Sequence, residues 1–324
     1  MPWTGLGVSR FRFEKGLHDL GRGLYAWLQP DGSWGWSNAG LVVDGDQSLL
    51  VDTLFDLPLT REMLAAMCDA EPRAARRIDT LVNTHANGDH CHGNQLVVGA
   101  EIVASRACAE ELAEFPPGRL ADLMKAYEGQ DSAVSRFVQR AFGPFDFSGI
   151  DPTPPTLTFE GTLTRRVGDK TVELLEVGPA HTRGDVLAFV PDDGVIFTGD
   201  ILFVEGTPIV WAGPVENWIR ACARILALGV DLVVPGHGPI SDHRGVEAVQ
   251  AYLEYVRDRA RERFDAGMGA LEAARDIPLA DFADWSDPER IVVNVDTLYR
   301  EFSDDPTPPD LPQLLAGMAE LAGC

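Results

Sequence analysis

Short apolar runs separated by turn residues dominate the first third of the chain. Leu41–Val43 and Leu49–Val51 flank a turn of Asp and Gly, which predicts a β-hairpin. Residues 59–70 show the spacing of an amphipathic helix. Residues 78–84 read as a buried strand, and residues 92–105 as a short helix followed by a strand. This alternation of strand and helix predicts an α/β fold.

The pattern changes twice further along the chain. Residues 104–145 read mostly as helix, with a break at Pro116-Pro117, and short strands resume after a proline-rich loop. From residue 243 onward the pattern is helical. We therefore expect a mixed core over residues 1–242, interrupted by a helical insertion near 104–145, and a helical C-terminal extension over residues 243–324.

The composition of the chain disfavours several classes of function. The 324 residues carry a formal net charge of −23, with 50 acidic against 27 basic side chains, which disfavours a nucleic-acid partner. The N-terminus shows no secretory signal and no apolar segment is long enough to span a membrane, so no membrane partner is expected. The five cysteines are odd in number and show no paired spacing. Free thiols in a cytoplasmic protein are the expectation.

Histidine or aspartate follows an apolar strand at five places along the chain. A strand-to-loop junction can present a metal ligand on a short, fixed stem, and glycines beside several of these junctions let the backbone approach closely. The residues at the five junctions are Asp52, the group His85, Asp89 and His90, then His181, Asp200 and His237.

This ordered set resembles the metallo-β-lactamase-fold hydrolases over roughly residues 38–242. The resemblance implies an αββα sandwich with metals at one edge between two sheets. Asp52 would orient the site, and Asp200 would bridge two metal positions. The implied metal ligands are His85, Asp89, His90, His181, Asp200 and His237.

The second motif departs from the family pattern His-x-His-x-Asp-His, because Asn87 replaces its middle histidine. An amide oxygen is a poor ligand for zinc and suits a harder ion better. We expect one tight Zn²⁺ site that contains Asp89 and His237, and one weaker site that contains His85 and His181 with Asn87 as a weak ligand. Iron or manganese remains open as the metal.

Four further residues are candidates for the wall of a substrate pocket. His92 lies two positions after His90, so on a helix it points about 200° away from it. Two roles stay open for His92: a polar residue at the pocket wall, or a metal ligand or proton shuttle. Two roles stay open for Trp34 and Trp36: they close the edge of a sheet, or they form an aromatic loop over the metals that contacts the substrate. The same two roles stay open for Trp211.

A metal ion lowers the pKa of a bound water to about 7 and polarises a carbonyl oxygen. Asp89 and Asp200 would be the catalytic carboxylates of a metal-dependent hydrolase that acts on a small-molecule ester, thioester or lactone. The stretches GTPIVWAGPVENW and DWSDPERIVVN look like thioesterase/cyclase proteins of aromatic polyketide pathways, which implies an aromatic acyl substrate. The alternative is a degenerate protein that binds or senses a ligand. The net charge of −23 disfavours a nuclease. The missing export signal disfavours a β-lactam hydrolase.

Overall fold

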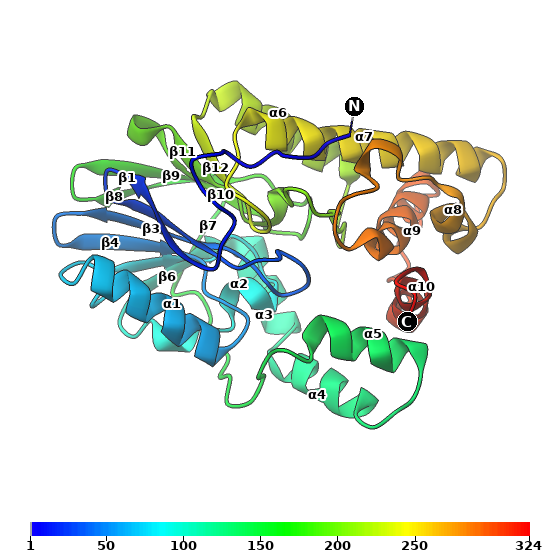
Figure 1. Cartoon of the computed structure of the whole chain (residues 1–324), viewed down its shortest axis with the longest axis horizontal. Helices are drawn as coiled ribbons and strands as arrows, with labels where there is room; N and C mark the ends of the chain where they lie inside the picture. Colours follow the sequence, from blue (N-terminus) through cyan, green and yellow to red (C-terminus); the bar gives the residue numbers. More distant parts are fainter. Residues whose placement is uncertain (1) are drawn as a thin grey trace.

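Two β-sheets face each other in the protein, and helices cover both outer faces (Figure 1). The structure is a computed structural model that describes residues 2–324. The first sheet has seven strands, antiparallel from β1 to β4 and parallel from β4 to β7. In spatial order they are β1 (Gly16–Gly21), β2 (Leu24–Leu28), β3 (Ala39–Asp44), β4 (Gln47–Val51), β5 (Thr80–Val82), β6 (Glu101–Ser105) and β7 (Leu157–Phe159).

The second sheet has five strands and is antiparallel except for its last pair, β11 and β12. Its strands in spatial order are β12 (Leu232–Val234), β11 (Val195–Phe197), β10 (Val186–Val190), β9 (Lys170–Glu176) and β8 (Thr162–Val167). The αββα sandwich expected from the sequence is confirmed.

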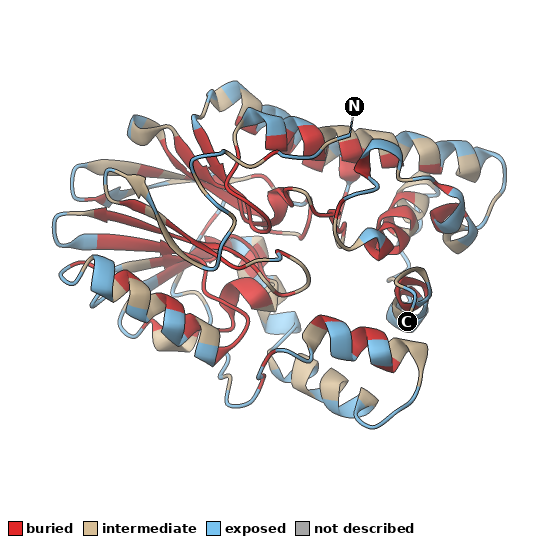
Figure 2. Cartoon of the chain, viewed as in Figure 1, coloured by how far each residue is buried: buried red, intermediate tan, exposed pale blue. Residues whose placement is uncertain are grey.

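The predicted hairpin of β3 and β4 shows why the sheets pack as they do. Side chains of a strand point alternately to its two faces. Val42 and Val51 point inward to an apolar cluster that includes residues of both sheets. Leu41 and Leu50 point outward to a cluster with Met63 of the first helix. Both faces of the first sheet are therefore apolar, and both are covered (Figure 2).

Helix α1 (Leu57–Ala70) covers the outer face of the first sheet, and Asp56 caps it by accepting a hydrogen bond from Leu59 N at 2.8 Å. Helices α6 (Val215–Leu228) and α7 (His243–Asp265) cover the second sheet. The apolar cluster beneath them also contains residues of the C-terminal helices, which are α8 (Ala270–Asp276), α9 (Ile291–Phe302) and α10 (Leu311–Leu321).

The predicted helical segment contains α3 (Arg106–Glu114), α4 (Gly118–Tyr127) and α5 (Ala133–Phe142), with the expected break at Pro116-Pro117. Helix α5 contacts α10, so the insertion meets the C-terminal extension (Figure 1). The shorter helices are α2 (Gly88–Cys91) and the 3-10 turns η1 (Asn94–Leu96), η2 (Pro191–Asp193), η3 (Gly199–Ile201), η4 (Ala280–Phe282) and η5 (Pro288–Arg290).

Two further expectations concern the whole chain. All five cysteines are free thiols, as the sequence predicted. Within residues 2–324, no helix is both long enough and apolar enough to cross a membrane.

Candidate metal centre

Strand ends from both sheets meet at one edge of the sandwich, and the predicted ligands lie there. Asp52 follows β4, and His85 lies three residues after the end of β5. Asp200 lies in η3 just after β11, and His237 lies in the loop after β12. Gly236 allows this meeting, because a Cβ at its position would overlap Asp200 Oδ1.

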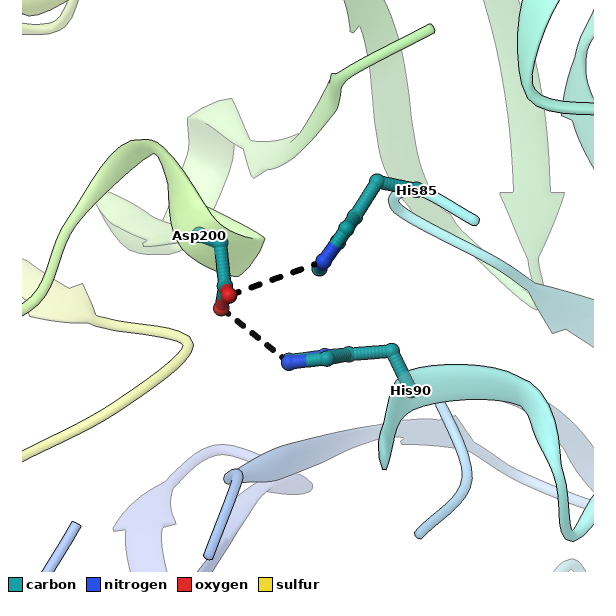
Figure 3. Close-up of side chains that lie close together, drawn as sticks. All are labelled: His85, His90 and Asp200. Carbon is teal, nitrogen blue, oxygen red and sulfur yellow. Dashed lines mark ion pairs between the residues drawn. The ribbon is translucent and has the colours of Figure 1, made fainter. Parts of the chain in front are cut away.

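The carboxylate of Asp200 lies at the centre of the group and presents one oxygen to each side. On one side, Oδ2 is 3.6 Å from His85 Nε2 and 3.3 Å from His181 Nε2. We call this side, His85, His181 and Asp200 Oδ2, the first half-site. Figure 3 shows the side chains of His85 and His90 pointing toward Asp200 from two different segments.

On the other side, Asp200 Oδ1 is 3.0 Å from His90 Nε2 and 3.5 Å from His237 Nε2. Asp89 joins this side, with its Oδ2 at 3.2 Å from His237 Nε2 and 3.9 Å from His90 Nε2. Asp89, His90, His237 and Asp200 Oδ1 form the second half-site. The structure therefore brings all six predicted ligands together.

Each histidine is oriented by an acceptor on its other ring nitrogen. His90 Nδ1 donates to Asp52 Oδ2 at 2.9 Å, and His181 Nδ1 donates to Ile209 O at 2.7 Å. His237 Nδ1 donates to Gly32 O at 3.0 Å. In the neutral histidines that a metal ion requires, these hydrogen bonds fix the tautomer, so each Nε2 would offer its lone pair to an ion beside Asp200.

Thr84 orients the remaining histidine. Its hydroxyl donates to Asp52 Oδ2 at 2.7 Å, so it can accept from His85 Nδ1, which lies 3.0 Å away. Asp52 also accepts from Thr84 N at 2.7 Å. The expected orienting role of Asp52 thus extends to two histidines, one directly and one through Thr84.

The donor atoms suit a divalent cation. His85 Nε2, His90 Nε2 and Asp200 Oδ1 are buried and have no hydrogen-bond partner among residues 2–324. Lone pairs that face one another in a buried site repel unless a cation lies between them. A tetrahedral ion with ligands at about 2.1 Å spaces them by about 3.4 Å, which is close to the spacings in both half-sites.

Asn87 makes the two half-sites different. Its Nδ2 lies 2.9 Å from His181 Nε2. Because His181 Nδ1 is committed to Ile209 O, Nε2 must accept, and the amide must donate. One lone pair of the first half-site is therefore already taken by an N–H group.

Electrostatics reinforce the difference. Burial raises the pKa of Asp89, yet the charges of His90 and His237 outweigh it and lower the pKa to about 2. Burial lowers the pKa of His237, but Asp200 and Asp89 raise it to about 9. Burial lowers the pKa of His181 to about 3, and Asp200 offsets this only in part. Positive charge is thus favoured in the second half-site and disfavoured at His181.

His92 takes no part in either half-site. It ends α2, and its Nδ1 donates to Phe55 O at 3.2 Å, while its ring stacks on Phe55 with centroids 5.6 Å apart. Burial lowers its pKa to about 4. The two histidines have different partners, since His90 contacts Asp52 and Asp200 whereas His92 is buried against Phe55 and Phe147.

The three candidate tryptophans lie in different surroundings. Trp36 packs against Phe145 with ring centroids 4.7 Å apart. Trp34 Nε1 donates to Glu289 Oε1 at 2.9 Å, which ties its ring to the C-terminal extension. Trp211 is half-buried, and its backbone N–H donates to His181 O at 3.0 Å.

Sequence reasoning missed the supports of the histidines. Thr84 directly precedes His85, and its side-chain type was the one local signal available. Phe203 stacks on His237 with centroids 5.0 Å apart and planes at 8°. Gly32 supplies the acceptor for the same ring from 205 residues away, which no local pattern can show.

Comparisons with known proteins agree with this architecture. The human acyl-coenzyme A thioesterase MBLAC2 is 26% identical over 231 residues, covering 67% of this chain and 79% of that protein. Hydroxyacylglutathione hydrolase of Chromohalobacter salexigens is 31% identical over 153 residues, 46% of this chain and 55% of that protein.

Solved structures share the fold at lower identity. The inverting sec-alkylsulfatase Pisa1 from Pseudomonas sp. matches with a TM-score of 0.65 and 18% identity, over 89% of this chain and 50% of that chain. A metallo-beta-lactamase from Pontibacter korlensis matches with a TM-score of 0.57 and 18% identity, over 74% of this chain and 99% of that one. Residues 32–237, more than half of the chain, match the family model of the metallo-beta-lactamase superfamily. The chain belongs to the metallo-beta-lactamase superfamily.

Proposed function

We propose that this protein is a metal-dependent hydrolase of small-molecule acyl thioesters, with Zn²⁺ held tightly in the second half-site. The observation that carries the metal is the set of buried, unpartnered lone pairs around Asp200. The similarity to the human acyl-coenzyme A thioesterase supports the thioester.

The residues of the second half-site suit zinc. They offer two imidazole nitrogens and two carboxylates, which are among its usual ligands. When bound, the ion supplies Lewis acidity toward a carbonyl oxygen and makes water a stronger nucleophile. Iron or manganese can use the same donors, so metal analysis is part of the test.

Asp89 is the carboxylate that can reach incoming water. Its side chain is 12% exposed, against 2% for Asp200. We assign Asp89 the role of accepting a hydrogen bond from the attacking water and so orienting it. Asp200 faces both half-sites, with Oδ2 toward the first and Oδ1 toward the second.

The leaving group favours a thioester over an oxygen ester. Metal ligands must be deprotonated to bind, so neither Asp89 nor Asp200 has a proton to give to a departing group. A thiol of pKa near 8.5 departs as a thiolate at modest cost, whereas an alkoxide needs a proton donor. Thioesters therefore match what these side chains can do.

Asn87 bears on the number of ions. Its amide N–H already occupies His181 Nε2, so a second ion must displace this hydrogen bond and accept a poor ligand. We propose one tightly bound ion in the second half-site and weak binding in the first.

The finer substrate stays a prediction from sequence resemblance. An aromatic polyketide intermediate, released or cyclised by the same centre, is one acyl thioester that fits the proposal. The cytoplasm remains the expected compartment, supported by five free thiols.

The test measures metal content and turnover together. Elemental analysis of purified protein should find zinc at about one ion per chain. Thioesters and oxygen esters of the same acyl group, aliphatic and aromatic, are then compared before and after chelation. We expect thioester hydrolysis to be faster, to stop on chelation and to return with added zinc.

The alternative function, ligand binding or sensing without catalysis, predicts a different result. A degenerate ligand-binding protein would hold metal yet turn over none of these substrates. Protein that binds zinc tightly and remains inactive on the whole panel would overturn the proposed hydrolase. Hydrolysis that survives complete removal of metal would overturn the role of the ion.

A further inference from the structure

We propose that residues 287–290 of the C-terminal extension form a brace that positions His237 for metal binding. The brace comprises Asp287, Glu289 and Arg290, and it lies outside the region that matches the family model. It contacts both supports of the His237 ring, which are the loop that carries Gly32 and the ring of Phe203. The inference rests on the proposed metal site but needs no particular substrate.

The first support is the loop between β2 and β3. Gly32 O accepts the Nδ1 proton of His237 at 3.0 Å and so sets the rotation of its ring. Gly32 adopts φ +78°, and a Cβ there would lie 2.8 Å from Gly238 N, so this backbone sits tightly against the His237 loop.

The brace binds the two residues that follow Gly32. Ser33 Oγ donates to Asp287 Oδ1 at 2.7 Å. Trp34 Nε1 donates to Glu289 Oε1 at 2.9 Å. These hydrogen bonds join segments 254 and 255 residues apart in the sequence. The position of the Gly32 carbonyl therefore depends on the C-terminal extension.

The second support is Phe203, whose ring lies parallel to His237. The guanidinium carbon of Arg290 lies 5.1 Å from the centroid of Phe203 and 4.4 Å from that of Trp34. Such distances allow cation–π attraction to both rings. A single side chain thus contacts the loop that binds His237 and the ring that stacks on it.

Arg290 is itself held firmly. It is 2% exposed, its Nη1 donates to Thr207 O at 3.0 Å, and its Nη2 lies 3.0 Å from Asp287 Oδ2. A buried guanidinium that loses its partners is strongly destabilised, so the contacts of Nη1 and Nη2 favour the arrangement in which Arg290 keeps them. The brace therefore transmits a fixed geometry to the His237 ring.

Outer partners of a metal-bound histidine usually change metal affinity by about 10- to 100-fold when removed. The experiment uses two mild variants of the full chain. Trp34→Phe keeps an aromatic face for Arg290 and removes the bond to Glu289. Ser33→Ala removes the bond to Asp287. Zn²⁺ affinity is measured by competition with a chelator, and the Co²⁺-substituted absorption spectrum reports ligand geometry.

We expect each variant to bind Zn²⁺ about tenfold more weakly and to shift the Co²⁺ spectrum, while the fold is retained. The matched control is Trp285→Phe, in the same extension, where Trp285 Nε1 donates to Trp3 O at 2.6 Å. That variant should lose thermal stability and keep its metal affinity. Arg290→Lys, which retains the charge but loses the planar fork, should weaken Zn²⁺ binding at least as much as Trp34→Phe.

Two results would overturn the brace. One is unchanged Zn²⁺ affinity and an unchanged Co²⁺ spectrum in both Ser33→Ala and Trp34→Phe. The other is a loss of affinity in Trp285→Phe equal to theirs, which would mean a general effect of lower stability. Neither readout involves substrate, so failure here leaves thioester hydrolysis intact, and an inactive enzyme leaves the brace to be judged on metal binding alone.

Discussion

The two half-sites share one carboxylate and differ in almost everything else. The second half-site has a second carboxylate, Asp89, and its His90 ring is held by Asp52. The first half-site has no second carboxylate, and Asn87 stands where the family motif has a histidine, with its amide donating to His181. A single replacement in the motif, Asn87 for histidine, thus keeps the backbone arrangement of both metal positions and changes the ligands of the first half-site.

A metal ligand can be replaced by a residue that forms a hydrogen bond with a remaining ligand, as Asn87 does with His181. His181 Nε2 has a partner in Asn87, whereas His85 Nε2, in the same half-site, is buried without one among the described residues. The amide satisfies one histidine and leaves the other waiting for a cation. The first half-site has therefore lost one ligand and keeps another, His85, that is free to bind an ion.

The largest effect should come from removing what the half-sites share. Asp200→Ala deletes the oxygens that face both, so turnover of an acyl thioester should fall by well over 100-fold, as when a positioned electrostatic group is removed. Steady-state kinetics and metal analysis on the same preparation measure this. Asp131→Ala is the control, since the side chain of Asp131 is 96% exposed. An active Asp200→Ala enzyme would contradict the whole arrangement.

The next effect separates the half-sites. His237→Ala removes a ligand of the second half-site and should lower zinc affinity by at least about 100-fold. His181→Ala removes the histidine that is already bonded to Asn87 and should leave about one ion per chain. Elemental analysis after dialysis distinguishes them. If His181→Ala empties the protein and His237→Ala does not, the assignment of the tight site is reversed.

Much of this comparison was predictable from sequence. The ligands lie in the segments that follow β5, β9, β11 and β12, and strand ends gather at a sheet edge, so six scattered residues could be placed in one site. The replacement at Asn87 was visible in the motif itself. Helical geometry also predicted that His92 would not share the partners of His90.

The supports of the site were not predictable, for a physical reason. The hydrogen bonds of Trp34 to Glu289 and of His237 to Gly32 join residues more than 200 positions apart. Periodicity reports which face of an element is buried but not which distant chain lies against it. The hydrogen bond from Asn87 to His181 likewise needs coordinates, because only they show that His181 Nδ1 is committed elsewhere.

A gain of binding should follow from repairing the motif. Asn87→His replaces an N–H donor with a nitrogen lone pair beside His85 and His181, so metal content should rise from about one ion toward about two. Titration with Zn²⁺ or Co²⁺ shows the second binding event. Gln130→His, at an exposed position outside both half-sites, is a control for adding a histidine. Wild-type protein that already holds two tight, equivalent ions would refute the weak first half-site.

The smallest effect concerns Cys91, which lies between His90 and His92 and invites a covalent mechanism with either as its base. The structure argues against that role. Cys91 is 7% exposed, burial raises the pKa of its thiol well above the ordinary value, and Sγ donates to Asn87 O at 3.2 Å. The Nδ1 atoms of His90 and His92 are engaged with Asp52 and Phe55. Cys91→Ser should therefore change thioester turnover by less than about tenfold, well below the roughly 100- to 10,000-fold loss expected when a proton-transferring residue is removed. Turnover of one substrate by Cys91→Ser and by Asp200→Ala, measured side by side, distinguishes a metal-dependent mechanism from a covalent one. A dead Cys91→Ser enzyme with zinc still bound, next to an active Asp200→Ala enzyme, would make the thiol the nucleophile and reduce both half-sites to a scaffold.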